Sequence, residues 1–138
     1  MVETYSLALI AMTAIVLMMI VQSFVATGAQ RKLPDSVPGK LPENLGHESF
    51  AFRSHRTFMN SLETVPLMLI LGLIAIAAGL GSATLAWIMW IYLVARVAHM
   101  VLYYAIATEQ NPSPRSYFYL LGVLAQVVLI VLTFIALF

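Results

Sequence analysis

Polar side chains recur at helical spacing inside apolar stretches of this sequence. The first row comprises Arg53, Arg56, Asn60 and Glu63, at intervals of three, four and three residues. These intervals place all four side chains on one face of a helix. Arginine binds carboxylates through paired hydrogen bonds, and a glutamate can bind an ammonium group. The row therefore suits a small molecule that carries carboxylates and an amine, although a solvated helix extension with surface ion pairs would show the same pattern.

A second row comprises Arg96, His99 and Tyr103, at intervals of three and four within a long apolar run. An arginine at the centre of a bilayer costs roughly 2.5–3.5 kcal/mol on insertion scales, so Arg96 should face the protein interior. We expect Glu63 to be its ionic partner. Such a pair could fix helix packing alone, or it could support a functional site.

A third group, Arg115, Ser116 and Tyr119, lies where the last apolar run begins. We expect Ser116 to cap that helix, whose free backbone N–H groups and dipole favour an anion. Arg115 could instead be an anchor at the membrane interface, and the same interpretation is favoured for Arg31 at the end of the first run. If the rows converge, their arginines and hydroxyl groups would form a cationic pocket able to stabilise a thiolate.

The composition limits the class of protein that carries these rows. Hydrophobic residues make up 62% of the 138 residues and charged residues 9%, whereas soluble domains have near 45–50% and 25%. The mean hydropathy is +0.94 and the net charge +1. These values exclude a soluble enzyme, a disordered chain and a nucleic-acid binder. The chain has no cysteine, so a reactive thiol must come from a substrate.

Four apolar runs approach or exceed the roughly 20 residues that a helix needs to cross a bilayer. We expect one domain over residues 1–138, an all-α membrane protein with spans at about 5–29, 49–80, 85–107 and 116–138. We expect the four spans to form an up-down four-helix bundle. Arg31, Lys32 and Lys40 lie in the first loop and Arg115 closes the third, which predicts that these loops are cytoplasmic and that both termini lie on the opposite side. The C-terminus carries no retention signal, which favours a bacterial inner membrane.

The polar rows resemble the motifs of the MAPEG family, the membrane-associated proteins in eicosanoid and glutathione metabolism. The matching stretches are Arg56-x-x-x-Asn60-x-x-Glu63-x-x-Pro66, Arg96-Val97-Ala98-His99-x-x-x-Tyr103 and Arg115-Ser116-x-x-Tyr119, with a weaker match at Thr27-Gly28-Ala29-Gln30-Arg31. The resemblance covers all four spans in order, and the last two motifs look most like the microsomal prostaglandin E synthase branch. This sequence differs from that branch at Met59, where the branch has a second arginine. Arg53, one turn earlier, could take the place of that arginine.

The resemblance implies a homotrimer of four-helix protomers that binds glutathione at subunit interfaces near the cytoplasmic side. By this resemblance Arg56, Asn60 and Glu63 would hold the glutathione backbone, and Arg115 and Ser116 would flank the thiol as catalytic residues. The remaining expected site residues are His99, Tyr103 and Tyr119, Arg31 toward a neighbouring subunit, and Arg96 beneath the site. His47, in the first loop, is given no role.

The sequence therefore predicts a membrane glutathione transferase or peroxidase, with a detoxifying role and no metal. The bound thiolate would attack an electrophilic carbon, reduce a hydroperoxide or, as an isomerase, open an endoperoxide. A lipophilic substrate would enter along the first and fourth helices. Two alternatives are a non-catalytic lipid-binding scaffold of the same family, for which Arg115 would be superfluous, and a small four-helix exporter. An exporter should carry an acidic residue within its first span, whereas Glu3 lies outside it.

Overall fold

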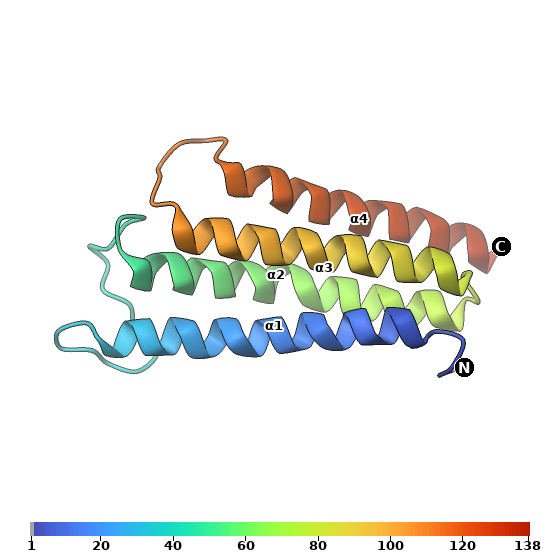
Figure 1. Cartoon of the computed structure of the whole chain (residues 1–138), viewed down its shortest axis with the longest axis horizontal. Coiled ribbons are helices and arrows are strands. Elements are labelled where there is room, and N and C mark those ends of the chain that lie inside the picture. Colours follow the sequence, from blue (N-terminus) through green and yellow to red (C-terminus); the bar gives the residue numbers. More distant parts are fainter. Residues whose placement is uncertain (1) are drawn as a thin grey trace.

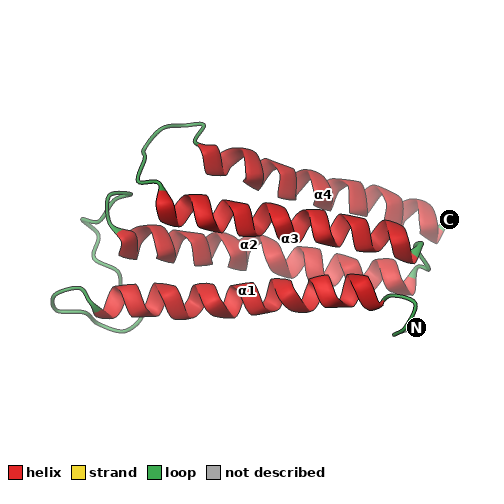
Figure 2. Ribbon diagram, viewed as in Figure 1, coloured by secondary structure: helices red, strands yellow, loops and turns green. Residues whose placement is uncertain are grey.

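The computed structural model describes residues 2–138 and consists of four long helices. They are α1 (Ser6–Arg31), α2 (Phe50–Ala77), α3 (Ser82–Ala105) and α4 (Pro114–Leu137). The helices alternate in direction, so both termini lie at one end and the two longer loops at the other (Figure 1). All four are long and apolar enough to cross a membrane, and no strand forms among the described residues (Figure 2). The predicted four-helix membrane bundle is confirmed.

The two middle helices hold the outer two together. Both α1 and α4 contact α2 and α3, but no contact joins α1 to α4 within residues 2–138. They lie at opposite edges of the molecule in Figure 1. One polar bond reinforces the packing, because the side-chain amide of Gln126 donates to the carbonyl oxygen of Thr64 at 2.8 Å. A single chain therefore does not form the expected substrate path along both α1 and α4.

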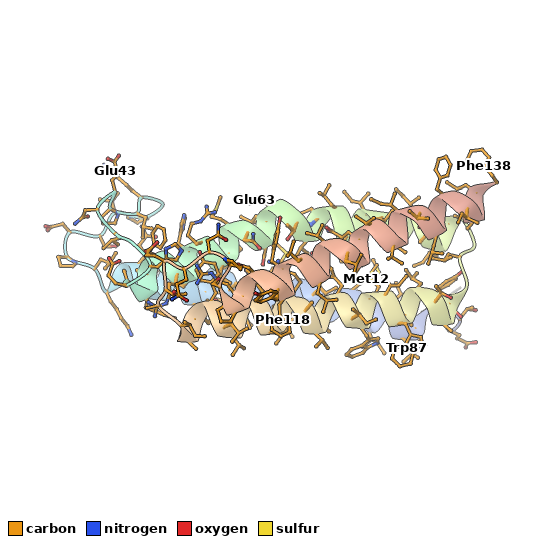
Figure 3. All side chains as sticks on the ribbon, turned by 90° about the horizontal axis from the view of Figure 1, so that it is seen from above. Met12, Glu43, Glu63, Trp87, Phe118 and Phe138 are labelled. Atoms are coloured by element: carbon orange, nitrogen blue, oxygen red, sulfur yellow. The ribbon has the colours of Figure 1, made fainter. Side chains whose placement is uncertain are left out.

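The core is apolar and closely packed, and so is much of the outer surface. Ile15, Val65, Met89 and Leu129 are fully buried at the helix contacts. The ends of the Met12 and Met89 side chains pack against Gly72 and occupy the space that a Cβ there would take. Large apolar side chains also project outward from every helix, as Figure 3 shows. This exposed apolar surface is what a lipid environment requires.

Helix α4 begins two residues earlier than the sequence predicts. Its N-cap is Ser113, and Pro114 occupies the first helical position, where the missing N–H removes no hydrogen bond. Ser116 is therefore not the cap. Its hydroxyl instead accepts from the backbone N–H of Ser113 at 3.2 Å and lies 3.1 Å from the Ser113 hydroxyl. Together these contacts fix the position of Arg115 at the start of the helix.

Candidate functional site

The polar rows meet at the end of the bundle where α1 and α3 end and α2 and α4 begin. In Figure 3 the nitrogen and oxygen atoms gather at this end, on the same side as Glu43, while apolar side chains cover most of the remaining length. The up-down order of the helices explains the convergence, because it brings the first and third loops together. Residues from all three predicted rows lie in this region.

The guanidinium of Arg115 is held against an aromatic ring of α3. Its Cζ lies 4.1 Å from the centroid of the Tyr103 ring, a distance typical of a cation–π contact. One terminal nitrogen, Nη2, points to the carbonyl oxygen of Thr108 at 3.4 Å, and the other, Nη1, is buried without a partner among the described residues. Arg115 is therefore positioned by its neighbours, and its Nη1 lacks a hydrogen-bond partner among the described residues.

His99 connects the start of α4 to the end of α3. Its Nδ1 lies 3.0 Å from the backbone carbonyl oxygen of Arg115, so this nitrogen must carry the proton. Its Nε2 is then an acceptor, and it is buried without a partner within residues 2–138. The imidazole meets the Tyr103 ring edge-on, with centroids 5.6 Å apart, and lies 6.2 Å from the Tyr119 ring. The structure thus brings four side chains together, which we call the Arg115 cluster: His99, Tyr103, Arg115 and Tyr119.

The predicted ion pair between Arg96 and Glu63 is wrong. Arg96 is only 1% exposed, but its Nη2 donates to the Asn60 side-chain oxygen at 2.7 Å and to the Ser61 hydroxyl at 3.0 Å. Glu63 lies exposed on the outer surface of α2. Three residues advance a helix by about 300°, so Glu63 is displaced by about 60° from Asn60 and misses α3. Neutral partners therefore hold the buried guanidinium.

Arg53 has a structural role that the sequence analysis did not foresee. Its side chain is buried, and Nη1 donates to the carbonyl oxygens of His47 and Glu48 at 2.7 and 3.0 Å. Its Nη2 donates to the carbonyl oxygen of Tyr104 at 3.2 Å. The guanidinium thus ties the first loop to the end of α3. It is occupied by backbone groups, and this geometry does not favour the prediction that Arg53 replaces the arginine missing at Met59.

Three of the expected site residues point away from the Arg115 cluster. Arg56 and Glu63 are exposed on α2, and Arg31 is exposed at the end of α1. Arg56 and Glu63 nevertheless lie on the same face of α2 as Asn60. Arg56 is about one turn before Asn60, and Glu63 is about one turn after it. Glu63 is the fourteenth residue of the 28-residue helix, and the apolar run of α2 begins two residues later at Val65, so a single chain would present a carboxylate at the edge of that run. Such a group requires a partner or a ligand to cover it.

The structure adds His47, to which the sequence analysis gave no role. Its Nδ1 lies 2.9 Å from Oε1 of Glu109, and its Nε2 lies 3.0 Å from the Tyr103 hydroxyl. Its backbone N–H also donates to Glu109 at 3.1 Å. Hydrogen bonds from that backbone N–H, and then from the ring, hold the pKa of Glu109 below its ordinary value of 4.5. No sequence periodicity links these residues, because two of them lie in different loops.

The sequence model of the MAPEG family matches residues 7–135, which is nearly the whole chain and includes every residue of the cluster. No curated protein and no solved structure matches the chain.

Proposed function

Because the chain belongs to the MAPEG family, we propose that it is a membrane-bound glutathione-dependent transferase or peroxidase that acts on lipophilic substrates. The observation that carries this proposal is the placement of Arg115. Its guanidinium is fixed against Tyr103 and retains an unpaired nitrogen, while the ring of His99 contacts the Arg115 backbone carbonyl. A cation held in this way, at the start of a helix, favours an anion at the same place.

Arg115 would act on the thiol of glutathione. A charge-assisted hydrogen bond contributes roughly 1.5–3 kcal/mol, and one pKa unit corresponds to about 1.4 kcal/mol. One arginine could therefore lower the pKa of the thiol by about one to two units. The thiolate would then attack an electrophilic carbon or the oxygen of a hydroperoxide. Ser116 would contribute less, because its neutral hydroxyl is already engaged with Ser113.

The face of α2 would bind the rest of glutathione. Arg56 and Glu63 are exposed and offer partners for a carboxylate and for the ammonium group. Asn60 uses its side-chain oxygen for Arg96, which leaves its amide N–H groups free to donate to the ligand. Glutathione bound here would cover the exposed carboxylate of Glu63.

We propose that the site is completed in a homotrimer. The support is that Arg31, Arg56 and Glu63 are exposed in one chain, and that α1 and α4 lie at opposite edges of it. A neighbouring subunit would bring its Arg31 to the α2 face and place its α1 beside α4, which would form the path for a lipophilic substrate. Chemical cross-linking in mild detergent should end at trimers, and a ladder that stops at dimers would contradict this assembly.

A non-catalytic lipid-binding protein is the second candidate. An apolar hollow of about 650 Å³ lies between α1 and α3, and its lining includes Leu17, Val21, Val94 and Val97. A lipid chain could occupy it without any chemistry. That alternative gives no role to the unpaired nitrogen of Arg115 or to the exposed charges on α2.

Titration calorimetry of the detergent-purified protein with glutathione tests the proposal. We expect the parent protein to bind, and Arg56→Gln and Glu63→Gln each to weaken binding about tenfold to a hundredfold, through the loss of one charge-assisted contact. Lys40→Gln, in the exposed part of the first loop, is the matched control and should bind like the parent. Turnover is then measured with an aryl halide and a lipid hydroperoxide. A parent protein that binds a fatty acid but no glutathione would favour the lipid-binding candidate.

A further inference from the structure

Three side chains form a continuous line of hydrogen bonds from the surface to the buried cluster. Glu109, in the loop between α3 and α4, has a side chain that is 72% exposed. His47, in the loop between α1 and α2, is 21% exposed and contacts it at 2.9 Å. Tyr103, on α3, is 8% exposed and lies 3.0 Å from the other nitrogen of the same imidazole. The line therefore joins solvent to the ring that supports Arg115.

The chemistry of the three groups fixes the direction of these hydrogen bonds. The pKa of Glu109 is held below its ordinary value by the bonds from His47, so near neutral pH its carboxylate only accepts. His47 then donates from Nδ1 to this carboxylate, and in its neutral form it accepts through Nε2. The Tyr103 hydroxyl consequently donates to His47, and its oxygen keeps a lone pair free. Tyr103 can accept a further proton only as it passes its own to His47.

Other charged and titratable groups surround the line from every adjoining element. Arg53 of α2 fixes the backbone of His47, and Glu48 lies next to it in the first loop. From α4, the Arg115 guanidinium lies over the Tyr103 ring, with its Cζ 4.1 Å from the ring centroid. His99 meets the same ring edge-on. The two histidines thus flank Tyr103, but only His47 bonds to its hydroxyl.

We propose that Tyr103, His47 and Glu109 form a proton relay that carries the thiol proton of bound glutathione to solvent. This inference rests on the proposed function. The S–H bond breaks as its proton passes to the Tyr103 oxygen, while the phenolic proton moves to Nε2 of His47. The imidazolium is stabilised by the Glu109 carboxylate, and its Nδ1 proton leaves to water at the exposed end. The thiolate remains beside Arg115, and no oxidant or reductant is needed.

Tyr103 would be the catalytic member, because it would touch the thiol, and His47 and Glu109 would be positioning residues that act through it. A purely structural clasp between the two loops would use the same contacts. The two roles differ in kinetics, because a clasp affects binding and stability whereas a relay affects the rate of proton transfer. The test must therefore measure these quantities separately.

The experiment compares the parent with His47→Ala and Glu109→Gln, using the full chain in detergent. Stopped-flow mixing with glutathione records the ultraviolet absorbance of the thiolate and, with an indicator dye, the protons released to solvent. We expect His47→Ala to bind glutathione within a few-fold of the parent but to form the thiolate about a hundredfold more slowly, the usual scale of acid–base catalysis. Added imidazole should restore much of the rate. Glu109→Gln should slow it less, and His55→Ala, a histidine on α2 outside the relay, should not slow it.

Each outcome of this experiment either supports or overturns the proton relay. A parent that binds and ionises glutathione while His47→Ala does so at the same rate overturns the relay and leaves the proposed function standing. A His47→Ala variant that loses affinity for glutathione but forms the thiolate at the parent rate also overturns the relay, because a structural clasp would give that result. If His47→Ala fails to fold, Glu109→Gln carries the test, because its exposed side chain can be replaced without loss of core packing. A parent that binds no glutathione overturns both proposals.

Discussion

The partners of Arg96 are neutral, so substitution of Asn60 should destabilise the protein more than substitution of Glu63. Asn60→Ala removes the acceptor at 2.7 Å from a buried guanidinium, so we expect the free energy of unfolding to fall by roughly 1.5–3 kcal/mol. Glu63→Gln should leave stability unchanged within about 0.5 kcal/mol, because the side chain is exposed and does not touch Arg96. Thermal or denaturant unfolding in detergent measures both variants.

The comparison contains its own control, since the two residues are three positions apart on one helix. If Glu63→Gln destabilises the protein as much as Asn60→Ala, Glu63 supports the fold and Arg96 has an ionic partner after all. Loss of glutathione affinity in Glu63→Gln with unchanged stability would assign the carboxylate to the ligand.

Glu109 should titrate at low pH, and the His47 amide should report it. The pKa of Glu109 is lower in the folded protein than its ordinary value of 4.5, so its contacts contribute stability above that value and lose it as the pH falls through the lowered pKa. The His47 N–H donates to this carboxylate at 3.1 Å, and its NMR shift should therefore change with a midpoint below 4.5. Glu109→Gln should abolish the transition, and a midpoint at or above 4.5 in the parent would contradict the contact.

At the scale of the helices and loops, Arg53 is the connection between the first loop and α3. Arg53→Met removes a charged donor from three backbone carbonyls, which should cost roughly 1.5–3 kcal/mol and free the loop. Limited proteolysis should then cut residues 32–49 faster than in the parent. Arg56→Met is the matched control, one turn further along the same helix but exposed, and should leave the cleavage rate unchanged. Equal cleavage of the two variants would contradict the structural role of Arg53.

The helices were predictable from the sequence, and the contacts of the loops were not. Apolar runs close to or above the length of a bilayer crossing predicted the four spans, and helical spacing grouped His99 with Tyr103 and Arg115 with Tyr119. Spacing could not tell which way Glu63 turns, because a difference of about 60° on one helix decides between α3 and the outer surface. His47 and Glu109 meet only because two irregular loops fold over the same end of the bundle, and no periodic pattern encodes that.

At the scale of the whole molecule, the bundle places the first and third loops at one end and the turn between α2 and α3 at the other (Figure 1). Lys32 and Lys40 in the first loop, with Arg31 and Arg115 at the adjoining helix ends, favour a cytoplasmic position for that end. The chain has no native cysteine, so single cysteines can be introduced at Ser36, Gln110 or Thr84, all of which are exposed. In intact cells an impermeant thiol reagent should label position 84 and leave 36 and 110 unmodified.

Ser113 is unsuitable for this experiment, because it is 1% exposed and caps α4. Labelling of all three positions after the cells are opened is the control for accessibility. The reverse pattern in intact cells would place the Arg115 cluster on the opposite side of the membrane.

The central claim is that the Arg115 cluster binds glutathione and ionises its thiol. The most direct measurement is the ultraviolet difference spectrum of the purified protein with saturating glutathione near neutral pH, for the parent and for Arg115→Ala. We predict a thiolate band in the parent. In Arg115→Ala we predict that the band is largely lost while calorimetric affinity stays within a few-fold, and that raising the pH restores it. Absence of the band in the parent, or an undiminished band in Arg115→Ala, would contradict the account.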